Sequence, residues 1–130
     1  MTEAEARIRV LIVDDHPLFR AGIRSLLGSQ HHIDVVGEAG DGKTAIQLVY
    51  ELRPDVVLMD ITLPQMSGIQ ATLQIKTDFP HVAIIGLSIH DSQEMAQAMA
   101  AAGSSVYLTK EAAADDLFHA IEAAVDTAHH

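Results

Sequence analysis

The stretch Val10-Leu-Ile-Val-Asp-Asp-His-Pro17 decides the fold that this chain is expected to adopt. Four aliphatic residues in a row are typical of a strand that is buried on both faces, as in a parallel sheet. A proline near the first turn is a common helix start, so His16-Pro17 predicts that a helix follows the strand directly. The acidic pair Asp14 and Asp15 lies between them, at the carboxyl end of the expected strand.

Strand-like and helix-like segments alternate along the rest of the chain. The five expected strands are Ile8–Val13, Ile33–Ala39, Val56–Met59, Val82–Leu87 and Val106–Leu108. The five expected helices run from Pro17 to Gly28, from Asp41 or Gly42 to the break at Pro54, from the cap Ser67 to about Asp78, from Asp91 or Ser92 to Ala102, and from Ala113 to Val125. Strict alternation of this kind predicts an α/β protein with a parallel sheet and helices on both faces.

The composition is that of a domain that folds without covalent cross-links. The chain has 130 residues, no cysteine and a net charge of −10. A chain of this length fits one domain and can bury roughly two-thirds of its unfolded surface. The absence of cysteine excludes disulfides and thiolate metal sites. The strong negative charge argues against direct binding to nucleic acid, because that binding rests on neutralising phosphates.

The ends of the chain carry no targeting signal. The segment Met1–Ala6 is acidic and lacks the apolar run of a signal peptide. No apolar stretch reaches the length of a membrane span, so we expect a cytoplasmic domain without membrane contact. We assign residues 1–128 to a single domain and interpret His129-His130 as the remnant of a purification tag. We expect this domain to be excised from a longer protein; a complete small protein is the alternative.

Polar residues with complementary chemistry stand at the carboxyl ends of four expected strands. Asp14 and Asp15 follow the first strand, Asp60 the third and Ser88 the fourth, and Lys110 comes just after the fifth. The carboxyl ends of parallel strands form the edge where α/β proteins bind their ligands. Three carboxylates there repel one another unless a cation joins them, and a few hard oxygen ligands suit Mg²⁺. The pattern predicts a metal site beside an acceptor carboxylate, with a hydroxyl and an ammonium group for incoming phosphate oxygens.

Four sequence motifs resemble those of response-regulator receiver domains, and the His-Pro pair after the acidic residues is similar to the NarL/FixJ-type subfamily with LuxR-type output. The motifs are Val10-Leu-Ile-Val-Asp-Asp-His-Pro-Leu-Phe-Arg-Ala-Gly-Ile23, Asp55-Val-Val-Leu-Met-Asp-Ile-Thr-Leu-Pro-Gln-Met-Ser-Gly68, Leu87-Ser-Ile-His90 and Tyr107-Leu-Thr-Lys110. They occur in the family's order, and the resemblance extends over residues 8–125. It implies a flavodoxin-like (βα)5 fold, a doubly wound parallel sheet with strand order 2-1-3-4-5, and a site between the first and third strands.

The resemblance implies a phosphoacceptor and a metal site. Asp60 matches the aspartate that accepts a phosphoryl group from a sensor histidine kinase. Asp15, Asp60 and the backbone carbonyl of Thr62 match the direct Mg²⁺ ligands, and Asp14 matches an acid that acts through water. Neutralisation of these carboxylates would make Asp60, otherwise a weak nucleophile, competent for phosphoryl transfer.

The resemblance also implies residues that respond to the phosphoryl group. Lys110 matches the lysine that pairs with phosphoryl oxygens, and Ser88 matches the hydroxyl that turns toward them. Tyr107 matches an aromatic switch that fills the space left by this movement. Thr62 and His90 match rim positions that flank the path of the hydrolytic water.

The implied function is two-component signal transduction. The chain would be a signalling domain, not an enzyme, although it would assist its own phosphotransfer and autodephosphorylation. Its partners would be a sensor histidine kinase and a C-terminal helix-turn-helix output domain that binds DNA and regulates transcription. That output domain is absent from this sequence, and the resemblance also allows a homodimer.

Three alternatives stay open at this point. A stand-alone receiver could act as a phosphate shuttle or as a protein-binding module. A phosphohydrolase of the haloacid-dehalogenase type would carry Asp-x-Asp after its first strand, whereas here Asp60 follows the third strand and Thr62 stands two residues on. A flavin-binding protein would need a Ser/Thr-rich phosphate loop after the first strand, where Asp14 and Asp15 would repel the flavin phosphate.

One departure from the family pattern adjoins the expected site. Most receivers have proline after the lysine, but this chain has Glu111. A cis peptide bond before a residue other than proline costs roughly 2.5–4 kcal/mol. We therefore expect a trans bond between Lys110 and Glu111.

Overall fold

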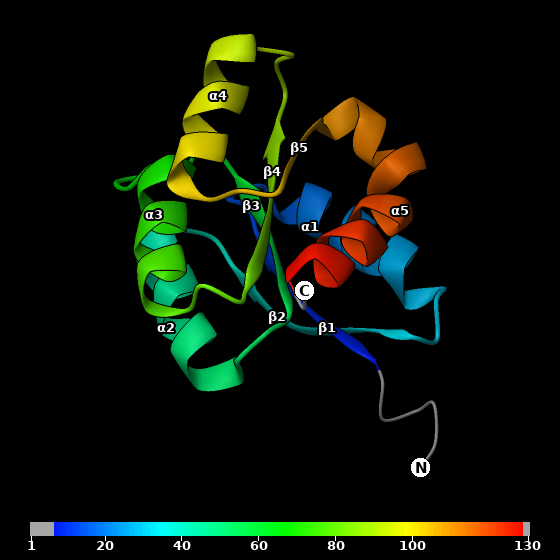
Figure 1. Ribbon diagram of the computed structural model, residues 1–130. Coiled ribbons are helices and arrows are strands. Elements are labelled where there is room, and N and C mark those ends of the chain that lie inside the picture. Colours follow the sequence, from blue (N-terminus) through cyan, green and yellow to red (C-terminus); the bar gives the residue numbers. More distant parts are fainter. Residues whose placement is uncertain (1–6, 129–130) are drawn as a thin grey trace.

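A five-stranded parallel sheet forms the centre of the computed structural model, which describes residues 7–128 (Figure 1). The strands are β1 (Ile8–Val13), β2 (Ile33–Ala39), β3 (Val56–Asp60), β4 (Ala83–Ser88) and β5 (Val106–Thr109). They lie in the order β2-β1-β3-β4-β5, and every neighbouring pair is parallel. The predicted flavodoxin-like (βα)5 topology is therefore confirmed, with the order reversing between β1 and β3.

Helices cover both faces of the sheet (Figure 1). On one side lie α1 (Pro17–Gly28) and α5 (Lys110–Ala128), and on the other lie α2 (Gly42–Leu52), α3 (Gly68–Asp78) and α4 (Gln93–Ala102). Each side encloses its own apolar cluster, because successive strand residues point to opposite faces. Within residues 7–128, no helix combines the length and apolar character needed to cross a lipid bilayer.

Short polar residues fix where three of the helices begin. The side chain of Asp41 accepts a hydrogen bond from a backbone N–H of the first turn of α2, and Ser92 does the same for α4. Ser67 and Gln70 form a reciprocal capping box at the start of α3. Gly103 ends α4 with a φ of 115°, in the left-handed region that favours glycine. These residues are the start and stop signals that the sequence analysis used.

The structure corrects the predicted bounds of the last elements. Helix α5 begins at Lys110, not Ala113, because the Thr109 hydroxyl accepts a hydrogen bond from the backbone N–H of Ala112 at 3.1 Å and so caps the helix earlier. Strand β4 is displaced by one residue from its predicted range. No cis peptide occurs in the described chain, so the expected trans bond before Glu111 is confirmed. The interpretation of residues 129–130 as a tag remnant lies outside the described residues.

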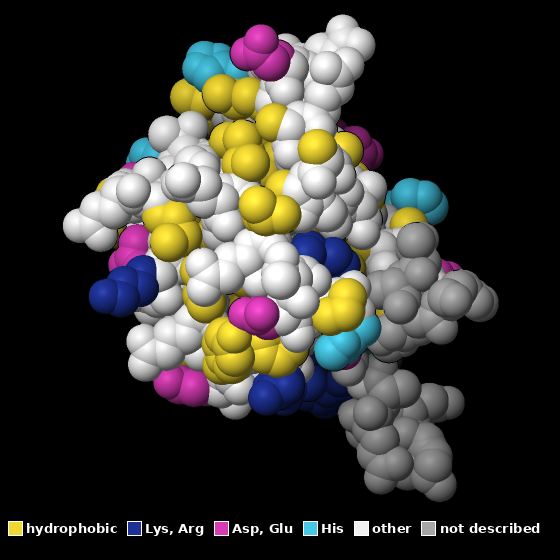
Figure 2. Space-filling view, turned by 60° about the vertical axis from the view of Figure 1, so that its left-hand side comes forward, with side chains coloured by type: hydrophobic (Ala, Val, Ile, Leu, Met, Phe, Trp, Pro, Cys, Tyr) yellow, Lys and Arg dark blue, Asp and Glu magenta, His cyan; other side chains and the backbone are white. Residues whose placement is uncertain are grey.

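Charged side chains are dispersed on the molecular face shown in Figure 2. Lysine and arginine side chains occur there in separate small groups, between acidic, apolar and uncharged polar side chains. A continuous basic stripe, which is the electrostatic footprint of nucleic-acid binding, is not visible on this face.

We expect the substitution Gly68→Ala to lower the free energy of unfolding by about 1–3 kcal/mol, the usual cost of overpacking. A Cβ at Gly68 would lie 2.1 Å from the backbone oxygen of Asp60, a contact that only backbone movement can relieve. Gly22→Ala is the matched control, because no atom lies within 4 Å of its added Cβ and alanine favours a helix. Chemical denaturation of both variants tests this expectation, and equal stability of the two would contradict it.

Candidate functional site

The polar residues predicted from the strand ends meet around one cavity. The register of β1 and β3 pairs Val13 with Met59, so the next residues, Asp14 and Asp60, stand side by side where the strand order reverses. This position is the usual ligand site of open α/β sheets. The cavity has a volume of about 320 Å³ and is lined by Asp15, His16, Asp60, Thr62, Ile89, His90 and Lys110.

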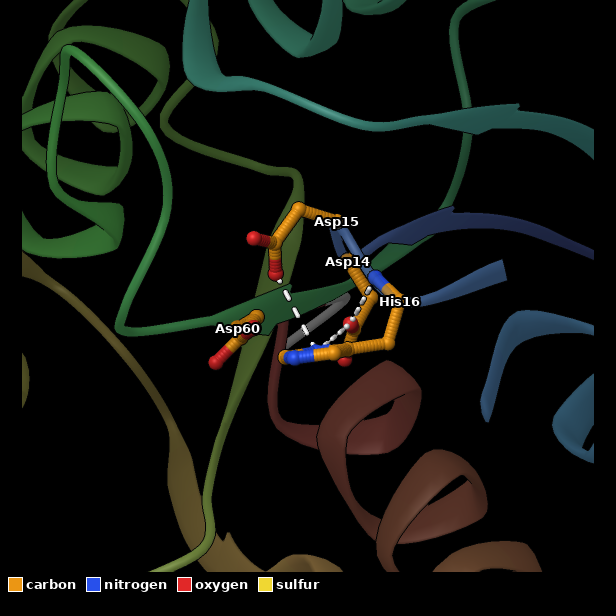
Figure 3. Close-up of side chains that lie close together, drawn as sticks. All are labelled: Asp14, Asp15, His16 and Asp60. Atoms are coloured by element: carbon orange, nitrogen blue, oxygen red, sulfur yellow. Dashed lines mark hydrogen bonds and ion pairs between the residues drawn. The ribbon is translucent and has the colours of Figure 1, made fainter. Parts of the chain in front are cut away.

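Two of the three aspartates are buried. Asp14 is 0% exposed and Asp60 is 3% exposed, whereas Asp15 lies at the surface. The three carboxyl groups converge with the ring of His16 at the end of the sheet (Figure 3). The imidazole Nδ1 lies 3.0 Å from Asp14 Oδ1 and 3.2 Å from Asp15 Oδ1. His16 occupies the N-cap position of α1, but its side chain makes no capping hydrogen bond.

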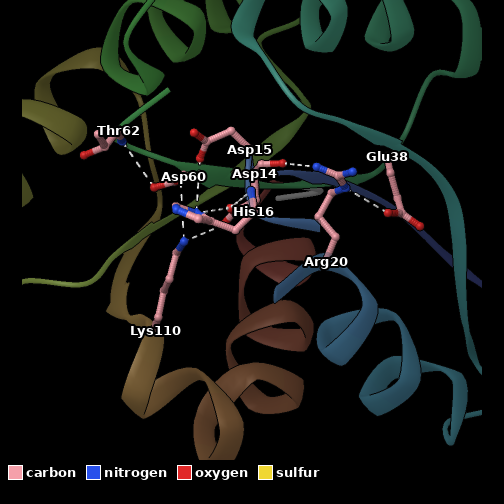
Figure 4. Close-up of polar contacts among 8 residues, drawn as sticks. All are labelled: Asp14, Asp15, His16, Arg20, Glu38, Asp60, Thr62 and Lys110. Carbon is pink, nitrogen blue, oxygen red and sulfur yellow. Dashed lines mark hydrogen bonds and ion pairs between the residues drawn. The ribbon is translucent and has the colours of Figure 1, made fainter. Parts of the chain in front are cut away.

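Lys110 is the cation on the buried side of this cluster (Figure 4). Its Nζ lies 2.6 Å from Asp14 Oδ2 and 3.5 Å from Asp60 Oδ2. The predicted convergence of Asp14, Asp15, Asp60 and Lys110 is therefore found. The ammonium group is closer to Asp14 than to the predicted acceptor Asp60.

The arrangement of donors fits a hydrated divalent cation. Asp14 Oδ2 is fully buried yet accepts no hydrogen bond from any described residue, so its ion pair with Lys110 is its only compensation. One ammonium group between two buried carboxylates leaves an excess of negative charge. One ligand atom each from Asp14, Asp15, His16 and Asp60 lies within 4.8 Å of the others. A cation near these atoms would remove the charge excess.

Ser88 and Tyr107 lie beside the cluster and are joined through one residue. The backbone N–H of His90 donates to Ser88 Oγ at 3.1 Å. The Tyr107 hydroxyl donates to the backbone carbonyl of His90 at 2.6 Å. Ser88 Oγ also lies 4.0 Å from the sulfur of Met95. The two predicted switch residues thus contact the same peptide segment, between β4 and α4.

Comparison with known proteins agrees with this geometry. The family described as "Response regulator receiver domain" matches residues 10–122. The chain belongs to the response regulator receiver domain family. A receiver domain is a signalling domain of two-component systems, which confirms the class predicted from the motifs.

Individual relatives support the same family assignment. The chain is 39% identical to the transcriptional regulatory protein DegU of Brevibacillus brevis, over 91% of this chain and 50% of that protein. A LuxR-family two-component response regulator from Aurantimonas sp. has 37% identity and a TM-score of 0.89, covering 93% of this chain and 86% of that chain. The isolated receiver domain of RcsB from Salmonella enterica serovar Typhimurium, solved with phosphomimetic BeF3⁻, has 30% identity and a TM-score of 0.83, covering 90% and 87%. The chain spans about half the length of the curated relatives it matches.

The pKa of the Asp60 carboxyl is shifted well above its ordinary value. Burial, and then the charge of Asp14, raise its pKa from 3.8 to about 6 against the opposing effects of Lys110 and the backbone N–H of Thr62. That N–H donates to Asp60 Oδ1 at 3.2 Å. Perturbed carboxyl groups in clefts are candidates for chemistry. Asp60 therefore stands out among the acidic groups of this cavity.

An arginine supports the acidic loop in a way that the sequence analysis missed. Arg20 of α1 donates a hydrogen bond to the backbone carbonyl of Asp14 and another, at 3.0 Å, to Glu38 of β2 (Figure 4). Glu38 also accepts from Arg24, whose hydrogen bond is the main cause that lowers the pKa of Glu38. An acidic residue near the carboxyl end of β2, with two arginines on the preceding helix, is the signal that could have revealed this support.

Removal of the Asp60 charge should stabilise the metal-free receiver in a pH-dependent way. Between about pH 4 and pH 6 the folded protein keeps a proton that the unfolded chain has lost, so the Asp60 carboxyl lowers the free energy of unfolding as pH rises through this window. Asp60→Asn cannot ionise and should raise that free energy by about 1–3 kcal/mol at pH 7.5, but much less at pH 4.

Urea unfolding in EDTA at both pH values measures this effect. Asp15→Asn is the matched control, since it removes a nearby carboxylate that is exposed, so that burial cannot explain its effect. A stability change in Asp60→Asn that is the same at both pH values would refute the explanation by burial.

Proposed function

We propose that this receiver accepts a phosphoryl group on Asp60 from a sensor histidine kinase, in a Mg²⁺-dependent reaction, and thereby switches an output domain. The observation that best supports this proposal is the position of Asp60. It lies buried at the carboxyl end of a central strand, beside Asp14 and Lys110, and lines an open cavity. The relative RcsB, solved with a phosphomimetic, supports the same chemistry for this family.

The proposed transfer is a displacement at phosphorus. A carboxylate oxygen of Asp60 forms the new P–O bond while the P–N bond of the kinase phosphohistidine breaks. The electron pair leaves with the imidazole, which takes a proton from solvent. Water later attacks the same phosphorus, returning the carboxylate and releasing inorganic phosphate. Thr62 and His90 line the cavity where this water would approach.

The charge requirements of this transfer match the residues around Asp60. Asp15, Asp60 and the backbone carbonyl of Thr62 would hold Mg²⁺ directly, and Asp14 would hold it through water. When bound, Mg²⁺ supplies neutralisation of the carboxylates and of the incoming phosphate, which is the main requirement of phosphoryl transfer. Lys110, whose Nζ is 3.5 Å from Asp60 Oδ2, would pair with a phosphoryl oxygen.

Ser88 and Tyr107 would transmit the effect of Asp60 phosphorylation to the surface of the domain. Phosphorylation adds about 1.5 to 2 negative charges and strong acceptor oxygens. Ser88 would turn its hydroxyl toward them and release the backbone N–H of His90. Because the Tyr107 hydroxyl donates a hydrogen bond to the carbonyl of His90, the position of Tyr107 would change together with the loop between β4 and α4. The affected surface would be the one formed by α4, β5 and α5.

The output would lie in a further domain. Two curated relatives are named as transcriptional regulatory proteins, and the match covers 50% and 56% of their lengths, so we propose residues 1–128 as the receiver of a cytoplasmic regulator with a C-terminal helix-turn-helix domain. DNA binding would belong to that domain, consistent with the net charge of −10 here. A homodimer of the phosphorylated form is a further proposed partner state.

Acetyl phosphate with Mg²⁺ should add one phosphoryl group to the protein, detected by intact mass. Asp60→Asn should abolish the addition, because no other acid of the cavity combines burial with access to phosphate. Asp116→Asn, which changes an exposed acid on α5, is the control and should label normally. Undiminished labelling of the Asp60 variant would disprove the assignment, and steady hydrolysis of small phosphoesters would favour a phosphohydrolase.

Mg²⁺ affinity should depend more on Asp15 than on Asp14. A direct ligand loses a metal bond when it is replaced, whereas loss of an outer partner typically costs about 10- to 100-fold in affinity. We therefore expect Asp15→Asn to weaken Mg²⁺ binding by more than about 100-fold and Asp14→Asn by about 10-fold. Calorimetric titration of both variants compares them, and equal affinities would refute the assignment of a direct role to Asp15 and a water-mediated role to Asp14.

A further inference from the structure

We propose that His16 supplies a nitrogen ligand to the metal ion held by Asp14, Asp15 and Asp60, so that this centre favours transition-metal ions over Mg²⁺ more than carboxylates alone would. The inference rests on the proposed function, because it concerns the same site. It assigns a role to a residue for which neither the motifs nor helix capping provides one.

The backbone directs His16 toward the carboxylates. Pro17 restricts the preceding residue to extended conformations, and His16 has a φ of −102° and a ψ of 105°. Its ring does not cap α1 but folds back against the acidic group (Figure 3). Nδ1 lies 3.0 Å from Asp14 Oδ1 and 3.2 Å from Asp15 Oδ1, so this ring nitrogen stands beside the carboxylate oxygens.

The separations suit a single ion. One atom from each of Asp14, Asp15, His16 and Asp60 lies within 4.8 Å of the other three. Ligands on opposite sides of an ion with bonds of about 2.1 Å stand roughly 4.2 Å apart. Small side-chain movements would therefore bring all four donors to one centre, directly or through water.

The protein compensates the charge of the carboxylates only in part. Asp14 Oδ2 is buried, and its partner in the described part of the chain is Lys110 Nζ at 2.6 Å. Lys110 approaches the cluster from the buried side, and its single charge serves both Asp14 and Asp60. The His16 side chain is 64% exposed, so it has room to rotate toward an ion.

The chemistry of the donor atoms determines which ions would bind more tightly when an imidazole is among the ligands. Mg²⁺ prefers oxygen ligands in a near-ideal octahedron and gains little from an imidazole. Imidazole nitrogen suits first-row transition metals, whose affinities for mixed nitrogen and oxygen sites rise from Mn²⁺ toward Cu²⁺. Replacement of His16 should thus weaken transition-metal binding selectively.

The test uses Mn²⁺ as a paramagnetic probe of the metal-free protein. His129→Ala and His130→Ala are present in every sample, so that terminal imidazoles cannot contribute. Electron spin-echo envelope modulation should show a ¹⁴N coupling from a coordinated imidazole in the parent protein and in His90→Ala, but not in His16→Ala. His90 is the matched control because it lines the same cavity but lies outside the four-residue cluster.

Binding titrations provide the second readout. We expect His16→Ala to raise the Kd for Mn²⁺ about 10-fold and the Kd for Mg²⁺ less than about 2-fold. An equal loss for both ions, or a ¹⁴N signal that persists in His16→Ala, would overturn the inference, as would a signal lost only in His90→Ala. Circular dichroism confirms that each variant is folded. If the parent protein shows no ¹⁴N signal but is still labelled on Asp60 in a Mg²⁺-dependent way, only the role of His16 is refuted. If the parent protein is not labelled on Asp60, the proposed function is refuted.

Discussion

The structure depends on holding three carboxyl groups of like charge at the point where the strand order reverses. Burial of a charge costs several kcal/mol unless partners compensate it. Both local and distant parts of the chain supply the compensation: the backbone N–H of Thr62 donates to Asp60, Arg20 of α1 donates to the backbone carbonyl of Asp14, and Lys110 of α5 pairs with Asp14. The remaining deficit appears as the raised pKa of Asp60. This deficit is what a cation would remove, so the fold itself builds the affinity of the site.

The peptide segment between β4 and α4 connects the charged site to the edge of the sheet. The two sides of His90 bind different residues, since its N–H donates to Ser88 and its carbonyl accepts from Tyr107. A movement of Ser88 toward a new acceptor therefore removes a contact on which the position of the loop, and with it the Tyr107 hydroxyl, depends. The proposed coupling would need no long chain of contacts, because His90, between β4 and α4, contacts both Ser88 and Tyr107.

Most of the fold could be predicted because local signals agree with the tertiary arrangement. Caps such as Ser67 and Ser92 stand where the helices begin, and apolar runs mark the buried strands. The convergence of Asp14, Asp60 and Lys110 followed from parallel topology alone. The start of α5 could not be predicted, because a threonine at the end of a strand can serve either as a strand residue or as a helix cap. The position of the His16 ring could not be predicted either, since it depends on the rotamer that two neighbouring carboxylates stabilise.

The strand that ends in Asp60 and the strand that carries Tyr107 differ in how deeply they are buried. All five residues of β3 and all six of β4 are buried, which fixes Asp60 between packed neighbours. Every residue of β5 is only half-buried, and β5 is an edge strand of four residues. Segments with fewer buried contacts open at lower free energy than the core. Tyr107 lies on this edge while Asp60 lies at the centre, so a change of charge can shift the edge without disturbing the geometry that the charge requires. Their separation by one buried strand, β4, which itself ends in Ser88, would allow the proposed acceptor Asp60 to stay fixed while the surface moves.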